Sequence, residues 1–395
     1  IANNSIANNK FGDNIGISST NGYFWSWNDM YIAAGDFDND GKVDVVKGGS
    51  SQVRVHRNLT TGPSTISTSS FDAGTNFTVS GQPRSIIVED INSDGKLDII
   101  TGSDSGVSVL LNTSTGSGSI SFASAVNLAS SYANTVRAAD FDSDGKLDLV
   151  TIRSASVAIY RNTSASSSSF SLAAEQVVNI PTLTSCSTMS VGDFNKDSKP
   201  DIVVSNSSNT AILLNGSSVG TIAFPNNVSL TGGGGSVLVG DFDNEGDPDI
   251  YLSNRIIVNN YSSGTISSSD FSTFTYTADG GSSAYSVSDL NGDGKVEIIG
   301  GSTWDANYLM LVGTLPISST SISPLSYFVA KTYGYTAGIG LGVDVDGDDK
   351  VDYVSAANYA SAFSVTQNIM MPVPSISVSG TLTAFSNCAG TASTA

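Results

Sequence analysis

The chain has 395 residues, of which 13% are charged, and its 36 acidic residues exceed its 17 basic ones to give a formal net charge of −19. No apolar run approaches the ~18 residues that a membrane-spanning helix needs, and no basic stripe typical of nucleic-acid binding is visible in the sequence. Two cysteines, Cys186 and Cys388, are too few for a disulfide scaffold.

An acid-rich nonapeptide recurs along the chain at intervals of 48 to 55 residues. Its seven copies begin at Asp36, Asp90, Asp140, Asp193, Asp241, Asp289 and Asp344. Two of them read DFDNDGKVD and DFDSDGKLD, with oxygen-bearing side chains at positions 1, 3, 5 and 9. One copy is compatible with an Asx turn in a hairpin, but seven copies in register indicate a repeated structural unit.

Taken in chain order, each unit predicts four short strands. In the second unit, SIIVEDI precedes the acidic loop, and KLDIITG, GVSVLLN and SISFASAVNLA follow it. The apolar pair after the last acidic position, here Ile99 and Ile100, predicts a second strand that is buried on both faces. A four-stranded repeat of about 50 residues is typical of a propeller blade.

After the seventh acidic loop only two strands remain, at 352–355 and 363–368, and an orphan segment at 10–17 precedes the first loop. We therefore expect an all-β fold, a seven-bladed β-propeller of four-stranded antiparallel blades, with the ring closed by the N-terminal strand in the last blade. This propeller is expected to occupy residues 1–371. Residues 372–395 are expected to be a linker and the start of a further β domain.

The acidic loops predict metal binding, because carboxylates held a few ångströms apart repel one another unless a cation joins them. Oxygen ligands in a flexible loop, with a backbone carbonyl at position 7, suit calcium better than magnesium, so we expect up to seven Ca²⁺ ions. The expected ligands, with the position-7 residues included for their carbonyls, are Asp36, Asp38, Asp40, Lys42, Asp44, Asp90, Asn92, Asp94, Lys96, Asp98, Asp140, Asp142, Asp144, Lys146, Asp148, Asp193, Asn195, Asp197, Lys199, Asp201, Asp241, Asp243, Glu245, Asp247, Asp249, Asp289, Asn291, Asp293, Lys295, Glu297, Asp344, Asp346, Asp348, Lys350 and Asp352.

Three copies depart from the pattern. Ser198 and Asp349 occupy position 6, where Gly is usual, and Glu245 replaces Asp at position 5. We expect these three loops to be the weaker or more distorted sites. Because loops of this kind with a Kd of ~0.1–1 mM fill outside cells and stay empty in cytosol, the chain is expected to be extracellular.

Large aromatic side chains lie in the segments that a propeller would place opposite the acidic loops. The residues expected to form a ligand-binding sector there are Trp25, Trp27, Trp304, Tyr308, Tyr333, Tyr335 and Tyr359. Aromatic rings beside amides and carboxylates suit a sugar or a protein ligand. The alternative is that these residues only pack the loops onto the ends of the blades.

The acidic repeats resemble the FG-GAP/VCBS repeats of integrin-like calcium-binding β-propellers over about residues 10–371. The tail after Met371 resembles linker segments in large surface proteins of Bacteroidota. The resemblance implies a secreted or cell-surface bacterial protein with calcium ligands in all seven loops.

We expect a non-enzymatic binding or adhesion module of a larger protein, whose partners are a glycan or protein ligand and adjoining domains of the same chain, with no nucleic acid and no membrane insertion. The only histidine, His56, is expected to be an ordinary strand residue rather than a catalytic base. A calcium-dependent polysaccharide lyase, an accessory domain of a polysaccharide-degrading enzyme and a structural spacer in a surface filament are the alternatives.

Overall fold

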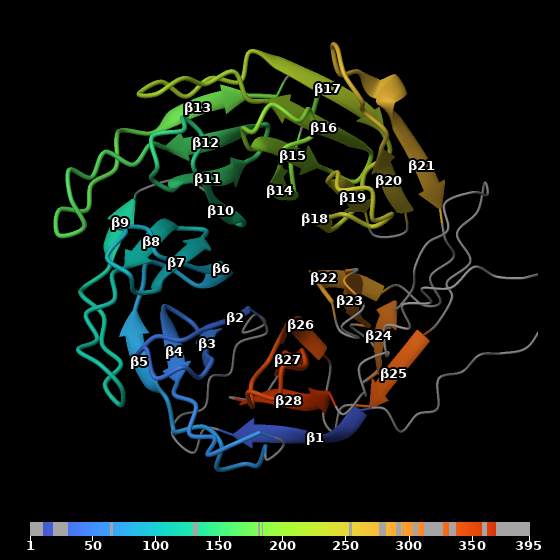
Figure 1. Cartoon of the computed structure of the whole chain (residues 1–395). Helices are drawn as coiled ribbons and strands as arrows, with labels where there is room; N and C mark the ends of the chain where they lie inside the picture. Colours follow the sequence, from blue (N-terminus) through green and yellow to red (C-terminus); the bar gives the residue numbers. More distant parts are fainter. Residues whose placement is uncertain are drawn as a thin grey trace, which may run out of the picture.

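The computed structural model describes residues 11–18, 31–63, 66–128, 133–180, 182–183, 185–252, 255–275, 282–289, 294, 296–302, 307–311, 327–331, 337–357 and 362–368. These residues form β-strands and turns, with one short 3-10 helix, η1 (Ser268–Asp270). Within this part of the chain, no helix is long and apolar enough to cross a membrane. Figure 1 shows four-stranded sheets arranged around a common centre.

Every sheet is antiparallel, and its strands run in order from the centre of the molecule to its rim (Figure 1). The innermost strands are β2 (Ile32–Gly35), β6 (Pro83–Glu89), β10 (Val136–Ala139), β14 (Thr188–Gly192), β18 (Val237–Gly240), β22 (Ser282–Ser288) and β26 (Ala337–Val343). The second strands are β3 (Asp44–Gly48), β7 (Asp98–Ser103), β11 (Asp148–Arg153), β15 (Asp201–Ser205), β19 (Asp249–Leu252), β23 (Glu297–Ser302) and β27 (Asp352–Ala357).

The third strands are β4 (Gln52–His56), β8 (Gly106–Leu110), β12 (Ser156–Tyr160), β16 (Asn209–Leu214), β20 (Arg255–Asn259), β24 (Asn307–Leu311) and β28 (Ala362–Asn368). The outermost strands are β5 (Thr75–Thr78), β9 (Val126–Leu128), β13 (Gln176–Asn179), β17 (Asn226–Thr231), β21 (Phe271–Thr275), β25 (Tyr327–Lys331) and β1 (Phe11–Ser18). These positions confirm the prediction of four strands per repeat.

Six of the sheets consist of four strands that are consecutive in sequence, and we number them blades 1 to 6 from β2–β5 to β22–β25. The remaining sheet, called the composite sheet below, has the order β1-β28-β27-β26. In it, β1 pairs antiparallel with β28, and Ile15 lies opposite Val365. Six blades of consecutive strands are therefore present where seven repeats were counted, because the last repeat has only three strands of its own.

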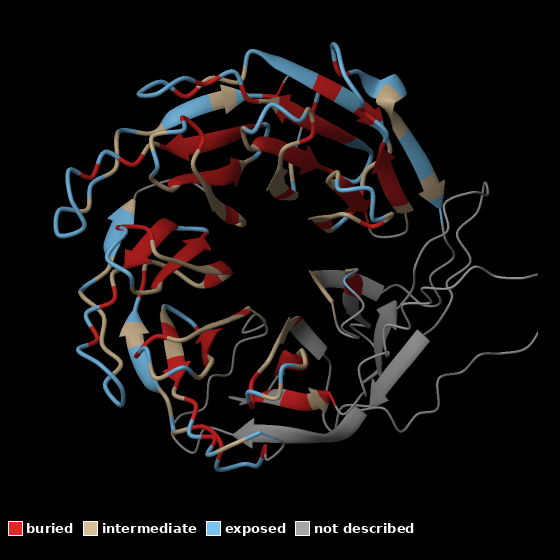
Figure 2. Cartoon of the chain, viewed as in Figure 1, coloured by how far each residue is buried: buried red, intermediate tan, exposed pale blue. Residues whose placement is uncertain are grey.

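The middle strands of each blade are the most buried, as Figure 2 shows for the blades that it colours. All five residues of β3 and all six of β7 are buried, whereas the residues of the outer strand β9 are exposed or half-buried. The run of apolar residues after each acidic loop explains this, because a strand covered on both faces cannot alternate with polar residues. The prediction of a doubly buried second strand is confirmed.

The hydrophobic core is divided among the interfaces between neighbouring sheets. Phe37, Val46 and Val55 of blade 1, for example, pack against Ile86 and Ile99 of blade 2. Burying one such side chain contributes about 1.5–3 kcal/mol, so each interface is held mainly by apolar contact. The proposed further domain at 372–395 lies outside the described residues.

Candidate metal centres

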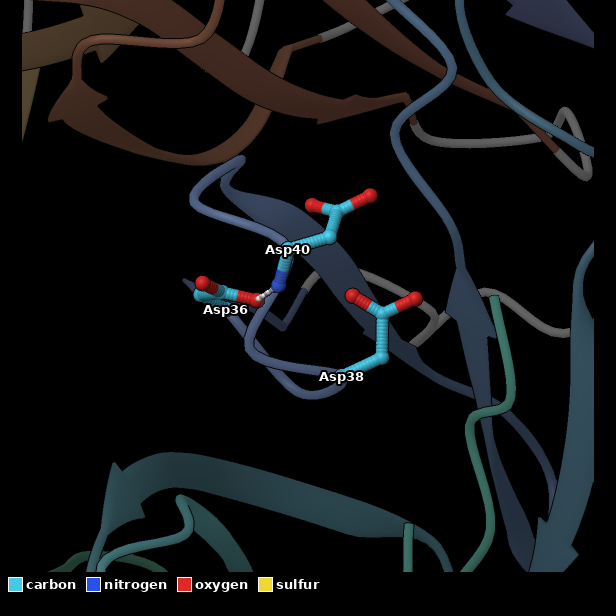
Figure 3. Close-up of side chains that lie close together, drawn as sticks. All are labelled: Asp36, Asp38 and Asp40. Atoms are coloured by element: carbon cyan, nitrogen blue, oxygen red, sulfur yellow. Dashed lines mark hydrogen bonds between the residues drawn. The ribbon is translucent and has the colours of Figure 1, made fainter. Parts of the chain in front are cut away.

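Each acidic loop joins an innermost strand to the second strand of the same sheet, and the six loops that are described in full fold around their position-1 carboxylate. In blade 1, the Asp36 carboxylate accepts hydrogen bonds from the backbone N–H groups of Asp40 (3.1 Å) and Gly41 (2.8 Å). Asp40 in turn accepts one from the N–H of Lys42 (3.0 Å). Figure 3 shows Asp36, Asp38 and Asp40 on this loop. Because the bonds span only a few residues, the loop sequence alone produces this turn.

Among the residues that the structure describes, acidic side chains come close together in four of the loops. In each group, the candidate ligand atoms all lie within 4.8 Å of one another. The groups are Asp36, Asp38 and Asp40; Asp140, Asp142 and Asp148; Asp241, Asp243 and Asp249; and Asp344, Asp346 and Asp348. A cation placed among such carboxylates would relieve their mutual repulsion.

The position-3 carboxylates test whether a cation fits. Asp38 and Asp142 are 0% and 1% exposed, and the Oδ1 atom of each accepts no hydrogen bond from any described residue. A buried carboxylate oxygen without a partner is costly. The donor set around it consists of hard oxygens, which suit calcium or magnesium rather than softer metals. The residues present therefore fit a hard divalent cation in loops 1 and 3.

The position-9 aspartates have a second, structural task. Asp44 is fully buried, and its carboxylate accepts hydrogen bonds from the N–H groups of Phe37 (3.0 Å) and Asn58 (2.8 Å). The same pair of backbone bonds recurs at Asp98, Asp148, Asp201, Asp249 and Asp352. Burial raises the pKa of Asp44, Asp98, Asp201, Asp249 and Asp352 to about 7 and that of Asp148 to about 6, although these bonds oppose the shift. Position 9 thus fastens the loop to the end of the third strand.

The three atypical loops keep the regular backbone course, so no distortion of the backbone is seen there, and their expected weaker metal binding stays a prediction. Ser198 (φ 64°) and Asp349 (φ 63°) adopt the left-handed conformation of Gly41 (φ 83°). Their N–H groups donate to Asp193 (2.8 Å) and Asp344 (2.9 Å), as Gly41 does to Asp36. Gly246, beside Glu245, donates in the same way to Asp241 (2.8 Å). The loop tolerates other residues at position 6 because polar side chains can adopt αL at moderate cost.

Several of the predicted site residues lie outside the part of the chain that the structure describes. In the sixth loop, Asp289 and the buried Glu297 are described, whereas Asn291, Asp293 and Lys295 lie outside the described residues. The same holds for Trp25, Trp27, Trp304, Tyr333, Tyr335 and Tyr359, and Tyr308 is placed only as a member of β24. The predicted aromatic sector therefore stays a prediction.

His56 and Cys186 lie away from the expected ligand positions. His56 is 1% exposed, its ring lies 5.2 Å from that of Phe363 between centroids, and its Nδ1 lies 3.1 Å from the Asp72 carbonyl oxygen. Burial lowers its pKa. Cys186 is a half-buried free thiol whose pKa burial raises to about 11. Both have the surroundings of packed structural residues.

The sequence interpretation missed an asparagine at the end of six of the seven third strands; after β24 of blade 6 the sequence has Val312 and Gly313 instead. In blade 2, Asn112 donates from Nδ2 to the carbonyl of Leu97 in its own loop and to that of Phe37 in blade 1, each at 2.9 Å. The equivalent residues that bond to the preceding sheet are Asn58, Asn162, Asn215 and Asn259. The Asn that recurs at the end of six third strands, as in HRN, LLN and YRN, was the available signal.

One cavity lies on the side of the acidic loops, where the loop of the composite sheet faces blade 1. It has a volume of about 410 Å³. Its lining residues are Gly41, Lys42, Val43, Thr60, Thr61, Gly62 and 344–347. The aromatic sector was expected on the face opposite the acidic loops, so both this face and the face with the cavity can be tested for ligand binding.

Comparisons with known proteins agree with this repeated geometry. A solved structure of BBS1N in complex with ARL6DN, soaked with mercury, is 9% identical, covers 91% of this chain and 97% of that chain, and has a TM-score of 0.56, a likeness of fold alone. The structure of an Agrocybe aegerita lectin that recognises non-reducing terminal N-acetylglucosamine is 16% identical, covers 91% of each chain and has a TM-score of 0.41. No curated protein sequence matches the chain.

The family model described as "FG-GAP-like repeat" matches residues 36–101, 90–151, 140–204 and 193–252. Each match begins at the first aspartate of one acidic loop and ends in the second strand of the next sheet. Together the matches cover more than half of the chain, and the chain therefore belongs to the FG-GAP-like repeat family, folded as a β-propeller of four-stranded antiparallel blades.

Proposed function

We propose that this propeller is a calcium-stabilised, extracellular and non-enzymatic binding module of a larger secreted or cell-surface bacterial protein. The observation that carries the proposal is the buried Oδ1 atom of Asp38, and its counterpart in Asp142, which accepts no hydrogen bond from the described residues. These oxygens lie among neighbouring carboxylates, which suits a cation ligand better than a residue that only shapes a turn.

Calcium would be held by the side chains at positions 1, 3, 5 and 9 and by the carbonyl at position 7 of each loop. Bound there, it would neutralise the clustered carboxylates and cross-link the two ends of the loop. Most of the net charge of −19 lies in these loops, so filling them would also reduce long-range repulsion within the molecule. Millimolar calcium outside cells matches the affinity range of such loops.

We further propose that the composite sheet serves as a seventh blade that closes the ring. Three contacts support this. The N-terminal strand β1 pairs with β28 along the edge of the sheet. Ile32 and Phe71 of blade 1 belong to one core cluster with Val354 and Phe363 of the composite sheet. Asn58 also bonds to the carbonyl of Val345.

A rigid ring of this kind offers a surface for a glycan or protein ligand. The BBS1N structure, whose fold is similar, was solved with the protein ARL6DN, and this supports a protein partner as one possibility to test. We place the ligand on the aromatic sector opposite the acidic loops, and the cavity beside Asp344 is the site to compare with it.

Native mass spectrometry of the protein, stripped with chelator and then titrated with calcium, tests the metal. We expect the mass to rise in steps to as many as seven ions, and magnesium at the same concentration to leave most sites empty. A protein that stays metal-free at millimolar calcium would refute the proposal.

The ligand is tested on glycan arrays and by pulldown with wild-type protein and with the pair Trp25→Ala and Trp304→Ala, checked for folding by circular dichroism. Loss of a bound ligand supports the aromatic sector, and unchanged binding argues for the other face. Release of an unsaturated, ultraviolet-absorbing product from acidic polysaccharides would instead indicate a lyase. Self-association without any ligand would favour the spacer.

A further inference from the structure

The residue just before the repeated asparagine of the third strand differs with the residue at position 3 of the acidic loop. Where position 3 is the acid Asp38 or Asp142, this residue is Arg57 or Arg161. Where position 3 is Asn92 or Asn195, it is Leu111 or Leu214. Blade 5 combines Val258 with the acid Asp243, and the composite sheet combines Gln367 with the acid Asp346, where the Gln367 side-chain amide donates to Asp346 Oδ2. An arginine therefore accompanies the acid in loops 1 and 3.

The two arginines contact their loops in the same way. Arg57 donates from Nε to Asp38 Oδ2 (2.7 Å) and from its terminal nitrogen to Asp40 Oδ2 (2.9 Å). Arg161 bridges Asp142 Oδ2 (2.5 Å) and Asp144 Oδ2 (3.0 Å). A planar guanidinium suits such a two-point contact. It binds the Oδ2 atoms and leaves the buried Oδ1 atom of each position-3 aspartate free of donors among the described residues.

The neighbouring blade completes the arrangement. The N–H of Gly118 in blade 2 donates to Asp38 Oδ2 (2.6 Å), and the N–H of Gly220 in blade 4 donates to Asp142 Oδ2 (2.8 Å). Both glycines have positive φ, 90° and 85°. In loop 2 the hydrogen bond between position 3 and the next blade runs in the opposite direction, because Asn92 donates from Nδ2 to the carbonyl of Ser167 in blade 3 (3.0 Å). Position 3 therefore carries an acceptor where the next blade presents an N–H, and a donor where it presents a carbonyl.

We propose that Arg57 and Arg161 are positioning residues for the cation in loops 1 and 3. Each binds the position-3 and position-5 carboxylates through their Oδ2 atoms, which would leave Oδ1 of the position-3 aspartate for the ion, and it neutralises the extra charge that Asp introduces in place of Asn. Loops 2 and 4 need no arginine, because their position-3 residue is the neutral Asn and the residue at the place of the arginine is Leu. This inference rests on the proposed binding of calcium. Residues that orient metal ligands typically change affinity by 10–100-fold when they are removed.

Hydrogen–deuterium exchange read by mass spectrometry, on peptides that cover loop 1 and loop 3 separately, measures calcium binding one loop at a time. We expect Arg57→Leu to raise the calcium concentration that half-protects loop 1 by about 10–100-fold and to leave loop 3, which keeps Arg161, unchanged. Arg161→Leu should give the mirror result. Arg57→Lys keeps the charge but not the two-point contact, so its calcium midpoint at loop 1 should lie between those of the wild type and Arg57→Leu. It replaces Arg57→Leu in the test if that variant does not fold.

A double-mutant cycle separates positioning from general stability. If Arg57 acts through Asp38, Arg57→Leu should change the loop-1 midpoint by less than about threefold in the Asp38→Asn background. Equal effects in both backgrounds, equal shifts at loops 1 and 3, or no shift at all would overturn the inference while leaving calcium binding intact. Absence of calcium-dependent protection in the unaltered protein would overturn both the inference and the proposed function.

Discussion

Asn58 and Val345 are 287 residues apart in the chain, yet the side-chain amide of Asn58 donates a 2.8 Å hydrogen bond to the Val345 carbonyl. The same amide donates to Val43 in its own loop (2.9 Å), and its oxygen accepts from the N–H of Thr60 (2.9 Å). Asn58 is fully buried. It thus connects the acidic loop of the composite sheet to that of blade 1.

Replacing Asn58 by Ala should lower the free energy of unfolding by about 3 kcal/mol, because it leaves buried carbonyl and N–H groups without partners. Chemical denaturation measures this loss, and hydrogen exchange should show faster opening of β27. The control is Asn227→Ala, at an exposed position of β17. Equal losses for the two variants would contradict a special role for Asn58.

Asp98→Asn should destabilise the protein even in chelator. The Asp98 carboxylate accepts from the N–H groups of Ile91 (3.1 Å) and Asn112 (2.7 Å), and an amide NH₂ would face one of these donors. We expect a loss of about 2–3 kcal/mol at pH 8, above the carboxyl pKa of about 7. The matched variant Asp94→Asn, in the same loop, should matter mainly when calcium is present. Denaturation curves with and without calcium distinguish the two, and a loss at Asp98 seen only with calcium would contradict the structural role.

Ser198→Gly should stabilise the protein by up to about 1 kcal/mol, since a non-glycine residue at φ 64° is strained. The reverse change, Gly95→Ala at φ 83°, should cost a similar amount. A Cβ added at Gly95 meets no atom within 4 Å, so the cost there comes from the backbone alone. Thermal denaturation in chelator measures both, and a change of the same sign in the two variants would be inconsistent with this explanation.

The imidazole of His56 should lose its proton at a pH below 6.5. Burial lowers its pKa, although the Asp72 carbonyl opposes this effect. Below the unfolded value of about 6.5 the unfolded histidine binds more protons than the folded one, so the contribution of His56 to stability should fall as the pH decreases, by at most about 1.4 kcal/mol at pH 5.5. The buried aspartates, whose pKa values are raised, have the opposite effect, so the comparison is between the wild type and His56→Gln. With one histidine in the chain, NMR follows its ring directly. A titration midpoint at or above 6.5 would refute the prediction, and His56→Gln should lose this part of the pH dependence.

Chelation should lower the melting temperature markedly. With a Kd of ~0.1 mM and ~1 mM calcium, each filled loop contributes roughly 1.4 kcal/mol to the free energy of unfolding, and several loops act together. Differential scanning calorimetry in EDTA and in calcium, with magnesium as the control, measures the shift. A change of less than a few degrees would argue against a structural role for the ions.

The sequence by itself determined the repeat, the position of the strands and the course of each acidic loop. These features depend on short-range rules. Asp36 accepts hydrogen bonds from the N–H groups of the residues four and five positions later, and a continuous run of apolar residues predicts that each second strand is buried. The regular course of the loops with Ser198 and Asp349 was not expected, because glycine is usual at position 6, but the local hydrogen bonds to Asp193 and Asp344 hold both residues at positive φ.

The tertiary structure alone decided what the loops touch. Asp44 was predicted as a metal ligand, but its bond with Asn58 shows that it also fixes the end of β4. The pairing of Asp38 with Arg57 and with Gly118 of the next blade depends on which oxygens and N–H groups two separate sheets present to each other. Local pattern cannot specify such contacts, because they form only when the faces of neighbouring blades pack together.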